Sequence, residues 1–397
     1  MTHIRSSKTF SAALLTVAHG LNDSYTAFLA ALMPLLIINL DLSLGMAGIL
    51  AAILSVAASL AQPLFGYLTD RGGGVAFIVL SPAITAVAMS SLGLWNSVAG
   101  VAVALAVGGI STAIFHPQAA ALCSLLSDKR RGLFMSMFVS GGTAGVALGP
   151  PFILAVVGSW GMERSILAAL PGVLIALFLM KFLPWRQRMR VSRESGGLAD
   201  IFRGSIRPMV ILWLIVVFRS WVVTSFHTFL GVHLSEGPGL TMTMVGWALA
   251  LFMASESGGA LLGGYLSDRM GRKRVVMTGL ILAIVPLMML IRADQPWLWP
   301  MLLVSGVLLG LPTSVTVVMA QETVPRGVAT ASGLTMGAGW AVGGLMVAPL
   351  GGIADQVGLV ATLTATPLLL LVALGLAMYI RVDRPLERRP MEVTNSD

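Results

Sequence analysis

Three polar side chains interrupt the first long apolar run of the sequence, and their spacing places them on one side of a helix. His19, Asn22 and Asp23 are three and four positions apart, the spacing at which helical side chains are neighbours. A carboxyl group in poorly hydrated surroundings holds its proton more tightly than in water, and an approaching cation weakens that hold. Asp23 is therefore a candidate for exchanging a proton against another ligand, and His19 can share the proton. The alternative is a hydrogen-bonded group that only holds helices together.

Ionisable side chains are rare inside the apolar runs, and Asp23, His116, Arg219 and Glu256 lie at similar depths. A charge at the centre of a bilayer costs about 2.5–3.5 kcal/mol on insertion scales, which makes such residues strong functional candidates. With a helical rise of about 1.5 Å per residue, each lies roughly 16–22 Å from a membrane edge. Because they come from both halves of the chain, we expect a central site between two helical bundles. Glu256 joins Asp23 and His19 as a candidate for proton coupling.

His116 is followed by a proline, which has no N–H to donate to the carbonyl of Ala113. This carbonyl and the imidazole could both face a cavity, where water or a ligand satisfies them. A plain helix kink with a packed histidine is the alternative. Gln118 comes next in the sequence and is predicted to lie beside His116 in the cavity.

Arg219 has no clear partner within its own apolar run, so two roles remain open for it. It forms an ion pair with Glu256 on the next span, or it is the counter-charge for an anionic group of a substrate. Nearby tryptophans either line the cavity or face lipid, as tryptophan often does near membrane surfaces. The predicted cavity residues are Asn22, His116, Gln118, Arg219, Trp221 and Trp247.

Long apolar segments must position these residues. Of the 397 residues, 56% are hydrophobic and only 11% are charged, whereas a soluble domain carries about a quarter charged residues. Runs of roughly 20 apolar residues, long enough to cross a bilayer, begin near 11, 44, 75, 97, 132 and 162. After a polar stretch they begin near 208, 241, 275, 297, 327 and 358. The sequence therefore predicts an all-α integral membrane protein with twelve transmembrane helices in two six-helix bundles around a central cavity.

Orientation follows from the basic residues, which give the chain a net charge of +8. Nearly all of them fall in short loops on the side of the N-terminus, which predicts that both termini are cytoplasmic. This distribution is a topology signal, so nucleic acid is not an expected partner. We expect a multi-pass protein of a bacterial plasma (inner) membrane. The predicted parts are an N-terminal bundle (1–183), a cytoplasmic linker (184–207), a C-terminal bundle (208–383) and a cytoplasmic tail (384–397).

One short sequence occurs twice, half a chain apart, as Gly66-Tyr67-Leu68-Thr69-Asp70-Arg71 and Gly264-Tyr265-Leu266-Ser267-Asp268-Arg269. Glycine lets two helices turn tightly and pack closely. An aspartate at a membrane edge can complement the dipole of a helix N-terminus from the other half, and arginines hold the loop at the anionic inner surface. The second copy alone continues into a basic stretch, so Asp268 is expected to matter more to gating than Asp70. The predicted gating residues are Gly66, Asp70, Arg71, Gly264, Asp268, Arg269, Gly271 and Arg272.

The second copy with its basic continuation resembles the signature loop of the major facilitator superfamily. Other segments are similar to the fosmidomycin-resistance branch of that superfamily, over nearly the whole chain. They are Gln62-Pro63, Ile114-Phe115-His116-Pro117, Gly141 to Pro150, Ala320-Gln321-Glu322 with Pro325, and Gly351 to Asp355. The resemblance implies that the paired loops close the cytoplasmic gate and separate as the halves move. In that branch an acid usually follows the proline, whereas Gln118 stands here, which puts a proton role at that position in doubt.

The resemblance also implies a function, namely proton-driven export of drugs or other small organic molecules by alternating access. Gly145, Gly149 and Pro150 resemble the antiporter motif of the fifth helix, although its upstream glycine is replaced by Ser136. Glycines four positions apart are also an ordinary packing surface between membrane helices, so both interpretations stay open. The main alternative function is an importer or exchanger of small organic anions.

An enzyme is not expected. The chain has no His-Glu-x-x-His, Gly-x-Ser-x-Gly or phosphate-binding Gly-Lys-Ser/Thr sequence, and its single cysteine, Cys123, excludes a disulfide framework. We expect no metal and no cofactor, with the proton gradient as the energy source. The expected partners are a small-molecule substrate, protons and the lipid bilayer, and the protein is expected to be a monomer.

Overall fold

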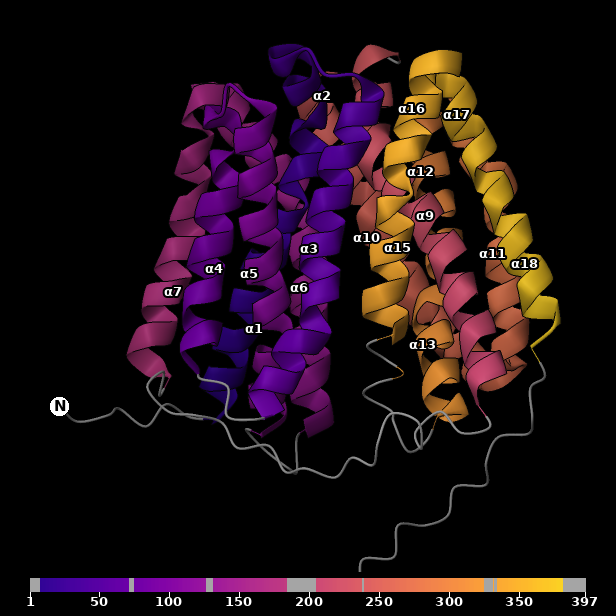
Figure 1. Cartoon of the computed structure of the whole chain (residues 1–397), viewed down its shortest axis with the longest axis horizontal. Coiled ribbons are helices and arrows are strands. Elements are labelled where there is room, and N and C mark those ends of the chain that lie inside the picture. The colour runs from indigo at the N-terminus through magenta and orange to yellow at the C-terminus, as the bar shows by residue number, and fades with distance from the viewer. Residues whose placement is uncertain are drawn as a thin grey trace, which may run out of the picture.

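The computed structural model describes residues 8–70, 75–125, 131–183, 205–237, 239–324, 331 and 334–380. Within these ranges only the backbone is described at positions 8, 61, 63–64, 66–70, 117, 121, 124–125, 131–136, 268 and 321. Every regular element in the described ranges is a helix. The helices run roughly parallel to one another, and α1 begins at the same end of the molecule at which α18 stops (Figure 1).

The first half of the chain forms one group of helices, and six passes can be followed through it. Its elements are α1 (Lys8–Thr26), α2 (Phe28–Leu40), α3 (Leu44–Asp70), α4 (Val75–Ser90), η1 (Ser91–Leu94), α5 (Val98–Leu125), α6 (Arg131–Trp160), η2 (Met162–Ala169) and α7 (Leu170–Phe182).

The second half forms the other group and repeats the six passes. Its elements are α9 (Ile206–Glu236), α10 (Met242–Met270), α11 (Arg272–Leu290), α12 (Leu298–Gly310), α13 (Pro312–Thr323), η3 (Leu334–Ala338), α15 (Gly339–Leu345), α16 (Val347–Val357), α17 (Leu359–Ala365), η4 (Thr366–Leu368) and α18 (Leu369–Met378). In Figure 1 the two groups lie side by side, the first indigo to magenta and the second red to yellow.

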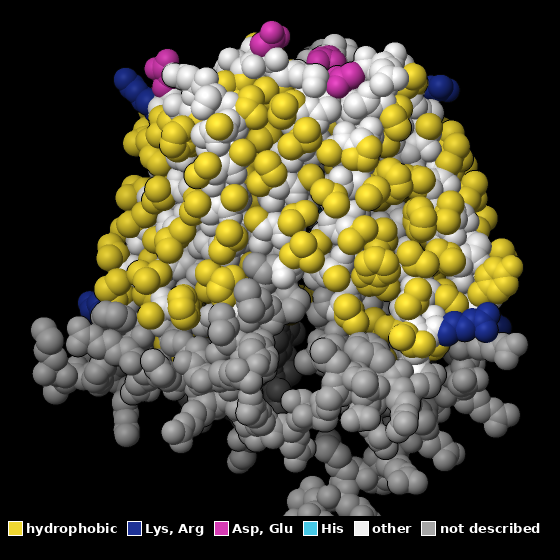
Figure 2. All heavy atoms as spheres, viewed as in Figure 1, with side chains coloured by type: hydrophobic (Ala, Val, Ile, Leu, Met, Phe, Trp, Pro, Cys, Tyr) yellow, Lys and Arg dark blue, Asp and Glu magenta, His cyan; other side chains and the backbone are white. Residues whose placement is uncertain are grey.

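The spans have the composition that a bilayer requires. In the described part of the chain, 11 helical stretches are long and apolar enough to cross a membrane, and a shorter apolar stretch, Leu44–Leu60, belongs to α3. Hydrophobic side chains cover the visible flank of the molecule, and acidic ones gather at the end away from α1's first residue (Figure 2). The prediction of an all-α membrane protein with two bundles is confirmed.

The first span is divided into two helices next to Asp23. Helix α1 stops at Thr26, α2 starts at Phe28, and the Thr26 hydroxyl donates to the backbone carbonyl of Asp23 at 2.7 Å. Pro34 inside α2 cannot donate to the carbonyl of Ala30. A Cβ atom added at Gly231 of α9 would lie 3.0 Å from that carbonyl oxygen, so α2 and α9 approach closely there.

A row of glycines on α6 lets α1 pack closely against it. Gly141, Gly145 and Gly149 are spaced four apart and face α1, and a Cβ atom added at Gly145 would lie only 1.8 Å from the carbonyl oxygen of Gly20. Such contacts let two helix backbones approach. We call this row the α6 glycine row. It contains Gly145 and Gly149 of the three predicted antiporter-like residues, and the structure gives these two glycines a packing role against α1. The third residue, Pro150, is not in the row, and its carbonyl oxygen would lie 3.4 Å from a Cβ atom added at Gly246 of α10.

Substituting alanine for Gly145 is expected to destabilise the protein, because the added methyl group overlaps the backbone of α1. Overpacking of this kind costs about 1–3 kcal/mol, so the thermal unfolding temperature in detergent should fall by several degrees. Gly158 lies on the same helix with nothing within 4 Å of an added Cβ atom, which makes Gly158→Ala the matched control. Equal unfolding temperatures for both variants would show that the close approach of α1 and α6 is not required.

The two halves meet at the end away from the first residue of α1. Asp355 at the end of α16 accepts hydrogen bonds from the backbone N–H groups of Leu44 and Gly45, at 2.7 and 2.8 Å. A Cβ atom added at Gly48 would lie 2.6 Å from the carbonyl oxygen of Val347. We call the contact between Asp355 and the first turn of α3 the outer latch. It joins the C-terminal half to the N-terminal half through the start of a helix.

Candidate functional site

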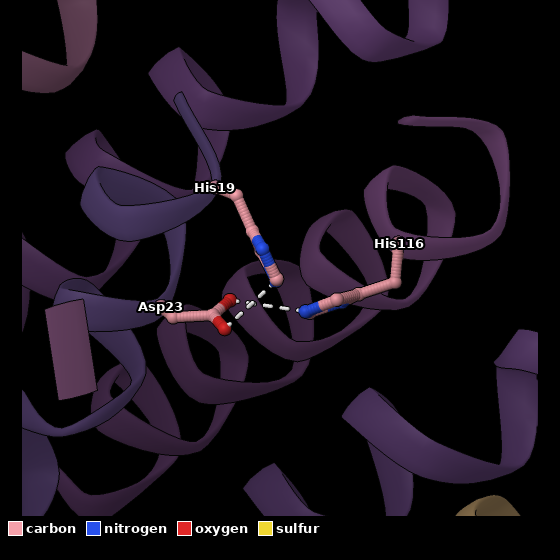
Figure 3. A group of neighbouring side chains, drawn as sticks. All are labelled: His19, Asp23 and His116. Carbon is pink, nitrogen blue, oxygen red and sulfur yellow. Dashed lines mark ion pairs between the residues drawn. The ribbon is translucent and has the colours of Figure 1, made fainter. Parts of the chain in front are cut away.

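Asp23 lies between two histidines, one on its own helix and one on α5. Its Oδ2 is 3.1 Å from Nε2 of His19, and its Oδ1 is 3.0 Å from Nε2 of His116 (Figure 3). The side chains of Asp23 and His19 are 14% and 8% exposed, whereas that of His116 is 28% exposed. We call these three residues the Asp23 triad. His116 is its most accessible member, so exchange with water or a ligand takes place most readily there.

The other nitrogen of each imidazole contacts a backbone carbonyl. Nδ1 of His19 is 2.7 Å from the carbonyl oxygen of Phe138 on α6, and Nδ1 of His116 is 2.9 Å from that of Thr112 on α5. The rings of His19 and Phe138 also stack at 4.0 Å. A carbonyl oxygen can only accept a hydrogen bond. Both Nδ1 atoms therefore carry a hydrogen, and both rings are held with Nε2 toward the carboxylate.

The triad also has the composition of a metal site, since its ligand-type atoms lie within 4.8 Å of one another. The spacing of these atoms argues for a different chemistry. Ligands bound tetrahedrally at about 2.0–2.1 Å from zinc lie about 3.3 Å apart. The observed contacts of 3.0 and 3.1 Å are those of ion pairs that share a proton. We therefore interpret the group as a proton-binding cluster.

Asn22 and Gln118 are enclosed in this conformation, with 0% and 1% of their surface exposed. The Asn22 amide borders the triad and donates to Oδ1 of Asp23 at 3.3 Å. Gln118 follows His116 by two positions on α5, which is about 200° around the helix, so it lies on the other side of α5. Oδ1 of Asn22 and Oε1 of Gln118 have no hydrogen-bond partner among the described residues. The sequence predicts both in a cavity, and the structure instead places both inside the protein, with Asn22 beside the triad.

A second carboxylate cluster lies in the other half. Glu256 on α10 is 3.6 Å from a terminal nitrogen of Arg219 and 3.0 Å from Nε2 of His227, both on α9. The Arg219 side chain is 1% exposed, donates to the carbonyl of Leu309 at 3.1 Å and lies 5.5 Å from the Trp340 ring. Of the two roles open for Arg219, the structure shows the ion pair with Glu256, in a position that a substrate does not reach in this conformation.

His227 is the functional residue that the sequence analysis missed. Its side chain is 24% exposed and covers the accessible side of Glu256, much as His116 covers Asp23. The available signal was its position eight residues, or about two helical turns, after Arg219, which keeps both on the same side of α9. Each carboxylate thus has one enclosed nitrogen partner, His19 or Arg219, and one more accessible histidine.

The two tryptophans of the predicted cavity set do not join either cluster. Trp247 lies nine positions before Glu256 on α10, which is half a turn out of phase, and it is 54% exposed. It therefore lies on the face of α10 opposite Glu256. Trp221 packs against Phe218, with ring centroids 6.5 Å apart, and its indole N–H has no partner among the described residues.

Comparison with known proteins decides the family. The model of the Major Facilitator Superfamily matches residues 13–237 and 212–394. The chain belongs to the major facilitator superfamily. It is 28% identical to the fosmidomycin resistance protein of Escherichia coli (strain K12) over 351 residues, or 86% of each chain, and 25% identical to the hexuronate transporter of that strain over 90% of each chain.

Solved structures agree with this assignment at the level of the fold. A bacterial homologue of the human lysosomal transporter Spinster, in an inward-facing and unoccupied conformation, superimposes with a TM-score of 0.79 at 18% identity. The alignment covers 93% of this chain and 96% of that one. The predicted membership of the superfamily is confirmed. The protein is therefore a transporter of small molecules and not an enzyme.

In this superfamily member the second signature loop can be described in part. Gly271 has φ +91°, a backbone conformation that side chains disfavour, and it separates α10 from α11. Arg272 forms an ion pair with Glu322 of α13 at 2.5 Å, and Arg269 lies 4.2 Å from the Tyr265 ring. A Cβ atom added at Gly264 would lie 3.4 Å from the Ser314 hydroxyl, which is ordinary contact.

The aspartates of the two signature loops remain predictions. The structure describes only the helical backbone at Gly66, Asp70 and Asp268, and it does not describe Arg71. Lys273, which follows Arg272, donates to the carbonyls of Met378 and Ile380 at 2.7 and 2.9 Å. The basic continuation of the second loop therefore fastens α11 to the end of α18 by satisfying carbonyls that lack helical partners.

Proposed function

We propose that the protein exports a small organic molecule in exchange for protons. The observation that carries this proposal is the Asp23 triad, an enclosed carboxylate held by two histidines in the interior of a span. Buried ionisable groups are costly inside a membrane and mark substrate or proton pathways. The similarity to a fosmidomycin resistance protein supports export of a drug-like substrate.

We further propose that the end carrying the first residue of α1 is cytoplasmic, in a bacterial inner membrane. The described basic residues at that end include Lys181, Arg269, Lys273 and Arg274, whereas the connections at the other end carry acids such as Asp294. An excess of lysine and arginine marks the cytoplasmic side. On this assignment the outer latch closes the extracellular side, and the conformation faces inward.

The proposed cycle follows from this geometry. Protons reach Asp23 and its histidines from outside and are released to the cytoplasm when the substrate enters. A carboxylate and two imidazoles suit this exchange because a substrate near the triad changes the electrostatic cost of keeping its protons. The two bundles then rock about the central site, which alternates the side from which it is reached.

Transport into proteoliposomes tests the proposed function. Vesicles containing the purified protein should accumulate fosmidomycin when their interior is made acidic. Fosmidomycin is chosen because the similar Escherichia coli protein is named for resistance to it. Protein-free vesicles and vesicles without a pH gradient serve as controls. Because protons leave an acidic interior in exchange for the compound, equal uptake with and without the gradient would contradict proton-driven exchange.

A second function, exchange or import of an organic anion, is supported by the similarity to a hexuronate transporter. The enclosed position of Arg219 weighs against it, because its side chain is 1% exposed and one of its terminal nitrogens already contacts both Glu256 and the carbonyl of Leu309. The proteoliposome experiment separates the two functions. Import with protons would require accumulation when the outside, rather than the inside, is acidic.

The outer latch should set the conformational balance. Replacing Asp355 by alanine removes the acceptor for the N–H groups of Leu44 and Gly45 and is expected to favour the outward-facing state. Loss of a helix cap costs about 0.5–2 kcal/mol, which changes the ratio of the two states by roughly 2- to 30-fold. Labelling of a cysteine introduced at Ala52, which is 4% exposed and lies on α3 one turn after Gly48, should become faster by about that factor. Asp294→Ala, on another loop at the same end, is the control. Unchanged labelling in Asp355→Ala would contradict a role for the latch.

A further inference from the structure

The contacts of the Asp23 triad determine how many protons it holds. Nδ1 of both His19 and His116 carries a hydrogen, because each contacts a carbonyl oxygen. Without a further proton, each Nε2 would present a lone pair to a carboxylate oxygen 3.1 or 3.0 Å away. Two electron-rich atoms repel at that distance, so each of the two contacts requires a proton of its own.

A single proton does not satisfy the triad. A proton on Asp23 can be directed to one imidazole, and the second contact then still joins a lone pair to an oxygen. Two protons satisfy both contacts, one at each Nε2, with the carboxylate accepting from both sides. A carboxylate between two positively charged donors is favoured in its ionised form.

We propose that His19, Asp23 and His116 together form a site that binds two protons at once, with both imidazoles charged. This inference rests on the proposed proton-driven export and adds to it that two protons are available for each transport cycle. It gives His116, which the sequence analysis assigns to the substrate cavity, a direct role in carrying a proton. The loaded site carries a net charge of +1, and the empty site carries −1.

The cluster around Glu256 differs from the triad in the contacts of the histidine Nδ1 atom, and these contacts determine how many protons a site must hold. His227 donates to Glu256 through Nε2 at 3.0 Å, and no hydrogen bond holds its Nδ1 among the described residues. A neutral imidazole with its hydrogen on Nε2 therefore makes this contact without an extra proton. Arg219 supplies the permanent positive charge. The Asp23 triad, and not the Glu256 cluster, is thus the proton store.

No other titratable side chain competes for the protons of the triad in its described surroundings. The helices that carry the triad or pack against α1 and α5 are α1, α3, α4, α5, α6 and α7. In the described part of these helices the other ionisable side chains are Tyr25 on α1, Cys123, which lies two turns along α5 from His116, and Lys181 in the last turn of α7. The Tyr25 hydroxyl is occupied elsewhere, since it donates to the carbonyl of Ala168 and accepts from the N–H of Gly172, both at 2.9 Å. Gly142 is the neighbour on α6, where an added Cβ atom would lie 2.5 Å from the His19 ring and 2.7 Å from the Asp23 carboxylate.

Nitrogen-15 NMR of the histidine rings tests the inference directly and needs no substrate. The full chain, labelled at histidine and reconstituted in lipid nanodiscs, is titrated from about pH 9 to about pH 5, the range in which imidazoles titrate. We expect two rings whose charged signals rise together. One is missing in His19→Gln and the other in His116→Gln, whereas His227→Gln retains both.

Asp23→Asn provides a second measurement with a different expected result. The anion that holds both charged rings is then absent, so the charged signals of the two remaining histidines should no longer rise together. One ring that stays neutral over the whole range in the wild type would overturn the two-proton site. If uptake is driven by the pH gradient but only one ring becomes charged, the two-proton site is wrong and the proposed function stands. If both rings become charged but uptake does not depend on the gradient, the proposed function is wrong and the two-proton site stands.

Discussion

Asp23→Asn is expected to abolish transport that is driven by a pH gradient, while leaving the protein folded. Asparagine has nearly the same shape and can still accept from one imidazole, but it supplies no negative charge to hold protons between His19 and His116. Uptake of fosmidomycin into proteoliposomes with an acidic interior should fall to the level of vesicles without a gradient. The Asp23 side chain is only 14% exposed, so surrounding water does not compensate for the negative charge that the variant lacks.

Asp41→Asn is the matched control for this experiment. Asp41 ends the same first span in a left-handed backbone conformation with φ 49°, which asparagine adopts readily. The variant removes a carboxylate from the same segment without touching the site, and its uptake should equal that of the wild type. If Asp23→Asn retained gradient-driven uptake, the triad would not couple transport to protons.

Arg219→Met should lower stability more than any other single change considered for the second half. It leaves Glu256 enclosed with one partner fewer, and breaking a buried ion pair costs about 3–5 kcal/mol. In a protein of 397 residues that corresponds to a fall of roughly 4–6 °C in thermal unfolding temperature. The measurement is thermal unfolding of the purified protein in detergent. Arg292→Met, at an exposed position, is the control and should change the temperature little.

The double variant Arg219→Met with Glu256→Gln identifies the cause of that loss. Neutralising both partners removes the uncompensated charge, and buried ion pairs are often replaceable by neutral groups at little cost. Most of the lost stability should therefore return. If the double variant unfolds no later than Arg219→Met, the loss comes from the packing of the arginine against Trp340 and the carbonyl of Leu309, and the ion pair contributes little.

The sequence predicted those parts of the site that lie on one helix. Asp23 and His19 are four positions apart, so their contact follows from helical geometry alone. The partnership of Asp23 with His116 depends on how α5 is rotated against α1, which no spacing within either helix determines. Arg219 with Glu256 was one of two open alternatives for the same reason. His227 was missed for the same reason, because its partner Glu256 lies on another helix.

The outer latch shows a different limit of sequence reasoning. Glycine followed by aspartate four positions later occurs in both signature loops, and it occurs again at Gly351 and Asp355. The physical role expected for such an aspartate, to complement the first turn of a helix from the other half, is found at Asp355. The sequence placed that role on Asp70 and Asp268. The end at which the two halves contact each other is a property of one conformation. The sequence is the same in every conformation, so it does not indicate which contact is formed.

The division of the first span has a mechanical consequence. Helix α1 packs against α6 along the α6 glycine row, whereas α2 contacts α9 of the other bundle as well as α6, where the Phe28 and Phe152 rings lie 5.9 Å apart. The backbone between Thr26 and Phe28, one helical turn from Asp23, therefore joins a segment packed within one bundle to a segment that also touches the other. In the proposed transport cycle, a rotation of one bundle relative to the other would act on this junction. On that proposal, torsion at the junction and charge at Asp23 are linked through a single stretch of main chain.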